Sequence, residues 1–414
     1  MKKYIAIGSL CLSMFFSACD NFLDIVPKGK AVLNATEDYL GLLEEVTADY
    51  DMENFWYLSG ETCNYNMPTL DAYQYPLPSI CFFWDETKNR NDYMETDGLY
   101  ESCYRRIAKF NVIINNINDS EGDSKDKVEG MAQAKVMRAY SNFILVNKFA
   151  KFYDKNTAAT DNGIILHDEL NLEATSKQYT VAEVYRSIQQ DIEDALSDLP
   201  ERALNTFRAD KYFGYALKAK VHLYKGEIDS ALNAGLNALK SDYHKLWDMP
   251  ALYTQLVSEF PFLPSSPSMW VMYVSRAIDD PENLLFQFGL NQFSPSPSYV
   301  RKPIIDLYDK NSDLRYIMCF AYYMPDRPTA EVGAVAMMNS NIKWNCGGIR
   351  LSEVYLMVAE CYARKGDKGN ALHYLNELRK MRMKPGTYED LDAADANEAF
   401  RLVRDERKRE LLLT

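Results

Sequence analysis

The stretch VYLMVAECYARKGDKGNALHYLNELRK, residues 354–380, has the pattern of two helices joined by a tight turn. Gly366 stands near its middle, and Ala359 and Ala371 lie on either side of this glycine, twelve residues apart. Small residues let two antiparallel helices approach closely, and glycine tolerates the backbone conformations that tight turns require. The stretch therefore predicts a helical hairpin.

A second stretch, YALKAKVHLYKGEIDSALNAGLNALK at residues 215–240, repeats these offsets. Ala219 and Ala231 are again twelve residues apart around Gly226, and each copy carries a ring three residues after its first alanine. The shared spacing resembles the tetratricopeptide repeat, in which paired helices stack into an array. Coincidental helical hairpins are the alternative. Under either interpretation these alanines build a scaffold and are not site residues.

Helical patterns also cover much of the remaining chain. Apolar residues recur every three or four positions over residues 100–117, and a helical pattern continues over residues 126–149. Thr180 and Glu183 have capping-box spacing, and Thr36 is a candidate cap for an earlier helix. The predicted fold class is mainly α, with tetratricopeptide-like helical hairpins forming a scaffold that carries long inserted loops and a few short strands.

The N-terminus has the layout of a secretory signal. Two lysines precede a mostly apolar run, which is shorter than the roughly 20 residues of a membrane-spanning helix, and small residues follow at Ser17-Ala18. Residues 12–19 resemble a bacterial lipobox, so we expect residues 1–18 to be a lipoprotein signal peptide and Cys19 to be acylated. An ordinary cleavage site that happens to hold a cysteine is the alternative.

Charge and cysteine usage exclude several classes of function. The formal net charge of −13 disfavours nucleic acid binding, which needs a basic face. The four histidines lie far apart, without a metal-binding motif, so the sequence predicts no metal site and no cofactor. Six cysteines remain after processing, and their irregular spacing predicts buried thiols rather than a disulfide framework: Cys63, Cys81, Cys103, Cys319, Cys346 and Cys361.

Sequence signatures of catalysis are missing. The chain has no GxSxG, Cys-His-Asn or P-loop pattern. A glycosidase needs two carboxylates about 5 to 10 Å apart, and no local context marks such a pair. The basic cluster at residues 401–409 is interrupted by acidic residues, which predicts a solvated helix with i,i+4 ion pairs. The sequence therefore predicts that the protein is not an enzyme.

Residues 51–104 are rich in aromatic side chains. Twelve of these 54 residues are aromatic, against 13% of the whole chain, and interspersed prolines favour a long loop. Tyrosine and tryptophan offer large rigid faces on which sugars stack, and nearby amides can bind sugar hydroxyls. The candidate ligand-binding residues are Trp56, Tyr57, Tyr65, Tyr73 and Tyr75, together with Asn64 and Asn66.

Other rings in the chain are expected to have structural roles. The stretch MWVMYV around Trp270 has the alternation of a buried strand, so Trp270 is expected to be structural. Trp247 and Trp344 lie in predicted loops and are weaker candidates for ligand contact. Four rings of the aromatic region are expected in the core: Phe82, Phe83, Tyr100 and Tyr104.

The two ends of the chain carry a family resemblance. CDNFLDIVPKG at residues 19–29 resembles the mature start of the SusD-like (RagB/SusD) outer-membrane lipoproteins. YRRIAKFNVIINNI, the RAY at 138–140, VYRSIQQDIEDALSDLP, IIDLYDKNSDLR and RLSEVYLMVAECYARKG follow in that family's order. The family continues past ERKREL with a segment rich in glycine, arginine and aromatic residues. This sequence stops at Thr414, so we expect a shortened C-terminus or a fragment.

The resemblance implies a domain organisation. Residues 19–414 would form a single SusD-like domain. Its N-terminal part, residues 19–205, would contain the aromatic loop region 51–104. Residues 206–414 would hold the helical repeats.

The resemblance also implies a function. The protein would be lipid-anchored in the outer membrane, would face the cell exterior, and would cap a SusC-like TonB-dependent β-barrel transporter through its helical repeats. It would bind a nutrient, usually an oligosaccharide or polysaccharide. Asp20, directly after Cys19, would indicate inner-membrane retention in some bacteria. The alternative function is a tetratricopeptide-like lipoprotein scaffold that binds peptides or proteins.

Overall fold

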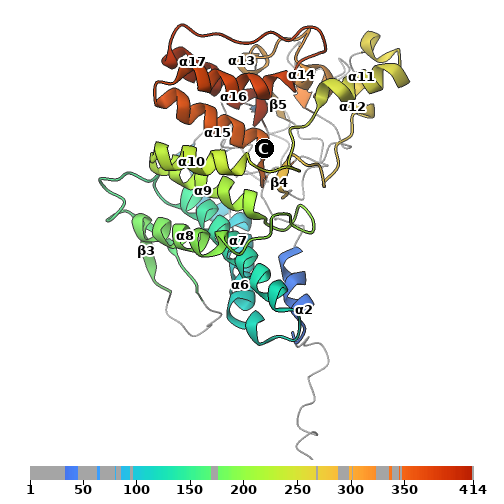
Figure 1. Ribbon diagram of the computed structural model, residues 1–414. Coiled ribbons are helices and arrows are strands. Elements are labelled where there is room, and N and C mark those ends of the chain that lie inside the picture. Colours follow the sequence, from blue (N-terminus) through green and yellow to red (C-terminus); the bar gives the residue numbers. More distant parts are fainter. Residues whose placement is uncertain are drawn as a thin grey trace, which may run out of the picture.

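The computed structural model describes residues 33–44, 63–65, 80, 85–93, 97–168, 176–266, 269–287, 298–300, 302–322, 335–337, 345 and 347–412. The predicted signal peptide and Cys19 lie outside these residues. Helices dominate the described chain, and the strands are short (Figure 1), which confirms the predicted fold class. No helix among the described residues is long and apolar enough to cross a membrane.

The longer helices are α6 (Gly98–Asn116), α7 (Ser124–Phe149), α8 (Val181–Leu196), α9 (Lys211–Lys225), α10 (Ile228–Ala238), α11 (Met249–Glu259), α15 (Leu351–Arg364), α16 (Lys368–Lys380) and α17 (Ala396–Glu410). Shorter ones are α2 (Thr36–Gly41), α12 (Trp270–Tyr273), α13 (Lys302–Ile305), α14 (Leu314–Cys319) and the 3₁₀ turns Leu42–Glu44, Arg90–Tyr93, Ile117–Asp119 and Leu263–Ser265. The strands are β1 (Cys63–Tyr65), β2 (Asn162–Ile165), β3 (Gln178–Thr180), β4 (Asn283–Leu285), β5 (Ser298–Val300), β6 (Phe320–Tyr322), β7 (Val335–Met337) and β8 (Ile349–Arg350).

Both predicted helical hairpins are present. Gly226 separates α9 from α10, and Gly366 separates α15 from α16. Their φ angles of 77° and 82° lie in the left-handed region that favours glycine. The four flanking alanines are buried. The hairpins pack through α10 and α15, and in Figure 1 the stacked layers are formed by α8, α9, α10, α15, α16 and α17.

Helix capping was predicted correctly at one position and wrongly at another. The Thr180 hydroxyl accepts the Glu183 N–H, and the Glu183 carboxylate accepts the Thr180 N–H at 2.8 Å, which completes the capping box of α8. Thr36, in contrast, is the first residue of α2 rather than its cap. The Asp38 carboxylate caps this helix start by accepting the Ala35 N–H at 3.0 Å.

A polar contact joins α6, α7 and α8 inside the helical layers. The Arg138 guanidinium of α7 donates to both oxygens of Asp191 on α8, at 2.8 and 2.7 Å. The same group donates to Oδ1 of Asn111 on α6 at 2.8 Å. Such two-point pairs hold neighbouring helices in a fixed orientation.

Trp270 is buried as predicted, but it lies in a helix and not in a strand. It is the first residue of the one-turn helix α12, and its ring stacks on Tyr253 with a centroid distance of 5.1 Å. One helical turn brings Trp270 and Val274 to the same side, and both are buried. A short apolar run does not distinguish this arrangement from alternation in a strand.

The basic cluster at residues 401–409 belongs to α17, whose exposed side carries the predicted i,i+4 contact between Arg401 and Asp405 at 3.3 Å. Its other side is not solvated. The side chains of Glu406 and Glu410 are 0% and 2% exposed and pair with buried arginines. The prediction of a solvated helix with i,i+4 pairs therefore holds for the exposed side of α17 and is wrong for Glu406 and Glu410, which turn inward.

Three predicted buried thiols are confirmed: Cys103, Cys319 and Cys361 are buried and free. Burial raises the pKa of Cys103 to about 11 and the pKa of each of the other two thiols to about 12.

Candidate functional site

The predicted ligand-binding residues fall on a part of the chain that the structure covers sparsely. Asn64 and Tyr65 lie in β1. Trp56, Tyr57, Asn66, Tyr73 and Tyr75 lie outside the described residues, and so do Phe82, Phe83 and Trp344. Ligand contact by all seven candidates stays a prediction.

Strand β1 joins this aromatic region to a segment far away in the sequence. It pairs antiparallel with β5, so that Asn64 lies opposite Tyr299 and Tyr65 lies opposite Ser298. The four-stranded sheet has the order β1-β5-β7-β6, and β5, β6 and β7 all lie between β4 and β8 in the sequence. Two insertions into the helical scaffold, the part of the aromatic region that precedes α6 (residues 51–97) and residues 286–348, therefore each contribute strands to one sheet.

The second insertion was not identified from the sequence as part of the site. A signal for it is present in NQFSPSPSYV at residues 291–300, which combines aromatic residues with Pro295 and Pro297 as residues 51–104 do. This aromatic and proline-containing stretch is shorter than residues 51–104. The pairing of β5 with β1 also depends on a contact between distant parts of the chain, which local patterns do not reveal.

Asn345 fixes the base of the second insertion. Its Oδ1 accepts the N–H groups of Gln287 at 3.0 Å and of Gly348 at 2.9 Å. Its Nδ2 donates to Oδ1 of Asn283 at 3.0 Å and to the Leu285 carbonyl at 2.6 Å. Because one amide satisfies partners on both sides, the chain leaves and re-enters the scaffold at neighbouring points.

Two long helices hold the same base. The Tyr140 hydroxyl of α7 donates to the Gly347 carbonyl at 2.6 Å, and Nη1 of Arg106 on α6 lies 3.4 Å from Oε1 of Gln287. Both polar contacts are buried. These contacts anchor the insertion on the helical layers.

The start of α6 and the end of α7 form an aromatic surface. The ring of Tyr100 contacts Tyr104 at 4.7 Å between centroids and meets Phe149 edge-to-face at 5.2 Å. Tyr104 in turn lies edge-to-face with His167 at 5.6 Å, and its hydroxyl donates to the Ile165 carbonyl at 2.9 Å. We call the four rings of Tyr100, Tyr104, Phe149 and His167 the α6–α7 ring cluster.

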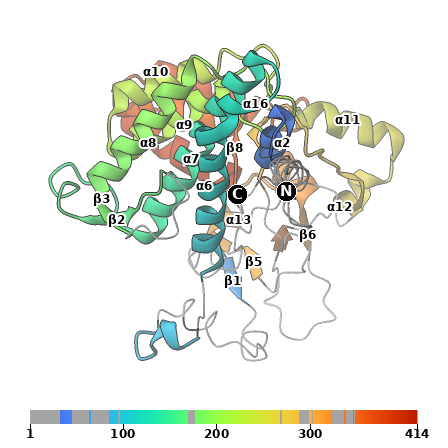
Figure 2. The same cartoon turned by 90° about the horizontal axis from the view of Figure 1, so that it is seen from below.

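The expectation that Tyr100 and Tyr104 belong to the core is wrong for Tyr100 and half correct for Tyr104. Tyr100 is 37% exposed and Tyr104 is half-buried. Tyr100 lies in the first turn of α6, where the helix end reaches the surface. In Figure 2 this end of α6 points to the side of the molecule on which β1 and β5 lie.

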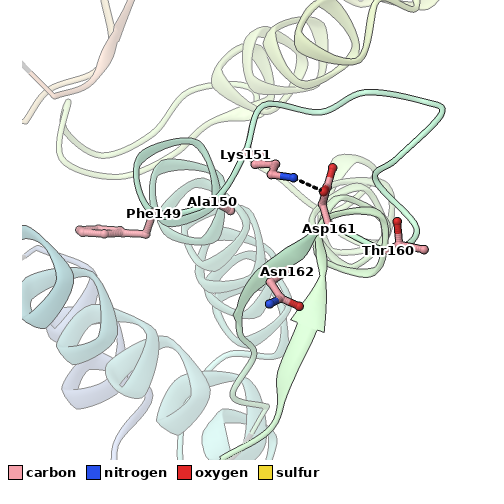
Figure 3. Close-up of a pocket in the computed structure, with 6 residues that line it drawn as sticks. All are labelled: Phe149, Ala150, Lys151, Thr160, Asp161 and Asn162. Atoms are coloured by element: carbon pink, nitrogen blue, oxygen red, sulfur yellow. Dashed lines mark hydrogen bonds and ion pairs between the residues drawn. The ribbon is translucent and has the colours of Figure 1, made fainter.

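A cavity of about 490 Å³ adjoins the ring cluster. Phe149, Ala150, Lys151, Thr160, Asp161 and Asn162 line it (Figure 3). Nζ of Lys151 donates to Oδ1 of Asp161 at 2.7 Å. The hydrogen bonds from Lys151 and Thr157 lower the pKa of Asp161, so its carboxylate is an ionised acceptor at neutral pH.

Trp247 has a structural position. Its ring lies under the Arg276 guanidinium at 4.6 Å, and its backbone N–H donates to Oε2 of Glu282 at 2.7 Å. Its carbonyl accepts a hydrogen bond from Arg382 at 2.8 Å. These contacts hold Trp247 in place as part of the scaffold.

Comparison with known proteins assigns this architecture to a family. Residues 21–223 match a family described as starch-binding and associating with the outer membrane, and residues 321–413 match the SusD family. The chain belongs to the SusD/RagB family. This SusD-family protein is 22% identical to a SusD-like protein of Formosa agariphila over 367 residues, which cover 77% of this chain and 68% of that protein.

Solved structures show the same fold. A SusD superfamily protein of Bacteroides thetaiotaomicron has a TM-score of 0.68 and 19% identity, with 91% of this chain and 86% of that chain covered. A laminarin-binding SusD-like protein has a TM-score of 0.60 and 17% identity, with 92% and 89% covered.

Proposed function

We propose that this SusD-family protein is a non-catalytic cell-surface lipoprotein that captures a nutrient glycan. It delivers the glycan to a SusC-like TonB-dependent transporter in the outer membrane. The acylated Cys19 tethers the protein to the membrane, and the two insertions carry the glycan site.

The observation that carries the proposal is the sheet in which β1 of the aromatic region pairs with β5 of the second insertion. This pairing joins β1, which holds Asn64 and Tyr65, to β5, which holds Ser298 and Tyr299. The Asn345 amide, Arg106 and Tyr140 anchor the second insertion on the helices. Anchoring the ends of an insertion lowers the entropic cost of binding by the segment between them.

Family membership and a structural relative support the class of ligand. The family match at residues 21–223 is described as starch-binding, and one protein of the same fold is described as laminarin-binding. Both polymers are neutral glucans, whose pyranose faces stack on tyrosine and tryptophan rings. The transporter partner and the lipid anchor follow from the family resemblance.

The proposal is tested with a glycan array and calorimetry on the mature protein. Replacing Tyr65, Tyr73 and Tyr75 together with alanine is expected to weaken glycan binding by at least about tenfold, because each ring offers a stacking face. The melting temperature should stay nearly unchanged. The matched control replaces three exposed rings outside both insertions, Phe152, Tyr224 and Phe262, which are 77%, 45% and 44% exposed.

Three outcomes contradict parts of the proposal. Equal binding by the Tyr65, Tyr73 and Tyr75 variant removes these rings from the site. An array without any bound glycan, together with soluble protein partners in a pull-down, favours the peptide-binding scaffold. Release of reducing ends from a bound polysaccharide contradicts the non-catalytic role. Mass spectrometry of membrane-extracted protein tests acylation of Cys19, and co-purification with a β-barrel protein tests the transporter partnership.

A further inference from the structure

We propose that the cavity at the end of α7 is a second carbohydrate subsite, which takes one neutral sugar unit of a longer glycan. The inference rests on the proposed function for the class of ligand. Its place is different, because its walls come from the end of α7 and the segment that leads into β2, and not from the two insertions. The volume of about 490 Å³ falls within the roughly 300 to 1,000 Å³ typical of small-ligand sites.

The backbone around the cavity is fixed by hydrogen bonds. The Asp161 N–H donates to the Thr157 carbonyl at 2.9 Å, and the Asp161 carbonyl accepts the Val181 N–H at 3.0 Å. Gly163 packs so closely on the start of α8 that a Cβ there would lie 2.9 Å from the Tyr179 carbonyl oxygen. The subsite is therefore preformed and does not require ordering of the loop on binding.

The charges in the cavity favour a neutral ligand. The Lys151 ammonium and the Asp161 carboxylate form an ion pair, so their charges cancel for an approaching ion. The side chain of Lys151 is 76% exposed and that of Asp161 is 9% exposed. A hydroxyl group can donate to the carboxylate and accept from the ammonium, whereas an anion or a cation gains from one partner and is repelled by the other.

Polar groups at the rim have free hydrogen-bonding capacity. Within the described residues, no hydrogen bond occupies the exposed side-chain amide of Asn162, which offers two donors and an acceptor. The Thr160 hydroxyl donates to the Thr157 carbonyl at 3.0 Å and can still accept a hydrogen bond. Adjacent hydroxyls of one sugar can use these groups together.

Phe149 supplies an apolar edge of the cavity. It is 36% exposed, and its edge-to-face contact with Tyr100 holds the ring in place. Figure 3 shows the ring extending from the end of α7, with Lys151 and Asp161 on the other side of that helix end and Asn162 on β2. The ring points away from the polar groups, so a glycan that runs along the α6–α7 ring cluster and past the end of α7 would meet the rings with one sugar unit and the polar rim with a following unit.

Two linked subsites on one polymer raise the affinity for that polymer, because the second contact is intramolecular. The cavity is therefore expected to strengthen binding of a polysaccharide more than binding of a single short oligosaccharide. Replacing Phe149 and Asn162 together with alanine should weaken polysaccharide binding by about tenfold. The matched control is Phe152→Ala, since Phe152 is 77% exposed, lies three residues from Phe149 and does not line the cavity.

Chemical acetylation of lysines, with and without bound polysaccharide, tests where the polysaccharide binds. Laminarin and starch are used first, followed by other polysaccharides that the array identifies. Mass spectrometry then compares Lys151 with Lys125. These side chains are 76% and 79% exposed, and each is paired with one carboxylate. Bound polysaccharide is expected to slow acetylation of Lys151 by at least about fivefold and to leave Lys125 unchanged, because a sugar in the cavity covers one ammonium alone.

The outcomes separate this inference from the proposed function. The subsite is supported if bound polysaccharide slows acetylation of Lys151 in the wild-type protein and does not slow it in the Phe149 and Asn162 variant. Polysaccharide binding with unchanged acetylation of Lys151 overturns the subsite and leaves the proposed function intact. If no polysaccharide binds the wild-type protein, both proposals fail.

Discussion

Arg382 and Glu410 form a two-point ion pair in the interior of the protein. Nε of Arg382 donates to Oε2 of Glu410 at 2.9 Å, and Nη2 donates to Oε1 at 2.9 Å. Nη2 also lies 3.0 Å from Oε1 of Glu282. This contact ties the end of α17 to the residue that precedes β4, and hence to the base of the second insertion.

The pair belongs to a larger buried network. Nη1 of Arg315 contacts Glu406 at 2.6 Å and Glu410 at 2.8 Å, and Arg276 contacts Glu282 at 3.1 Å. Removing one member leaves an opposite charge buried without its partner, which typically costs about 3 to 5 kcal/mol. The network is therefore sensitive to substitution and to protonation.

Acid should destabilise the protein through this network. Burial alone would raise the pKa of Glu406, but attraction by Arg315 and Arg409 outweighs it and lowers the pKa to about 2. The folded state thus binds this proton more weakly than the unfolded state, where a glutamate pKa is about 4.3. The resulting stability is complete above the unfolded pKa and is lost as the pH falls towards 2. Urea unfolding between about pH 6 and pH 3 is expected to show this loss.

The variant Glu406→Gln isolates the contribution of the ionised Glu406 carboxylate to the free energy of unfolding. At neutral pH it should lower the free energy of unfolding by about 3 kcal/mol, and the deficit should shrink as the pH falls, since the wild-type carboxylate is then protonated too. Glu377→Gln, at an exposed position of α16, is the control. Parallel pH profiles for the two variants would show that Glu406 is not held as a buried carboxylate.

Two aspartates with the same capping geometry should differ in their contribution to stability. Oδ1 of Asp210 accepts two N–H groups at the start of α9, at 2.9 and 2.9 Å, and Oδ1 of Asp395 does the same for α17. Asp210 is also buried, and its Oδ2 contacts the Tyr243 hydroxyl and Nε2 of His244, the latter at 2.9 Å.

Replacing Asp395 with alanine is expected to cost about 1 kcal/mol, the usual value for a helix cap. Replacing Asp210 should cost at least about 3 kcal/mol, because buried partners lose their acceptor as well. Urea unfolding at neutral pH gives both values. Similar losses in the two variants would mean that the buried contacts of Asp210 contribute nothing beyond the cap.

Local patterns predicted much of the scaffold. The alanine and glycine spacing at residues 215–240 and 354–380 reflects contacts between residues that are close in the sequence. Such contacts can be predicted without knowing the rest of the fold. The capping box of Thr180 was predictable for the same reason. The position of Thr36 was not predictable in this way, because its hydroxyl contacts Ser120 and the Glu121 carbonyl, which lie 84 and 85 positions away in the sequence.

Long-range contacts limited the prediction of the buried network and of the site. Glu406 and Glu410 looked solvated because their partner Arg315 lies 91 and 95 positions away. The pairing of Asn64 with Tyr299 joins residues even farther apart in the sequence, so residues 51–104 could be recognised by composition but their neighbours could not. Tyr100 was assigned to the core because periodicity gives the face of a helix and not the depth of its first turn.

The buried thiols should be unreactive in the folded protein. Burial raises the pKa of Cys103 to about 11 and those of Cys319 and Cys361 to about 12, so little thiolate forms near neutral pH. Alkylation followed by peptide mass spectrometry is expected to label these three residues at least about a hundredfold faster in urea than in buffer. Ser230→Cys, at an exposed position of α10, supplies a control thiol. Labelling of the three cysteines at the control rate in buffer would contradict their burial.

Gly348 is expected to be essential for the base of the second insertion. A Cβ at this position would overlap the Leu285 carbonyl oxygen and would lie 2.5 Å from Oδ1 of Asn345. Gly348→Ala must therefore separate β4 from β8 or break the Asn345 contacts, and both changes displace the insertion that carries β5. Gly369→Ala is the matched control, since its Cβ would lie 3.7 Å from the nearest atom, in the first turn of α16. We expect a loss of at least about 3 kcal/mol of unfolding free energy for Gly348→Ala, and a change of less than about 1 kcal/mol for Gly369→Ala.

Calorimetry with a bound polysaccharide should show weaker binding for Gly348→Ala even below its melting temperature, because the anchored segment has moved. Wild-type affinity in a folded Gly348→Ala variant would separate the glycan site from the β4–β8 base.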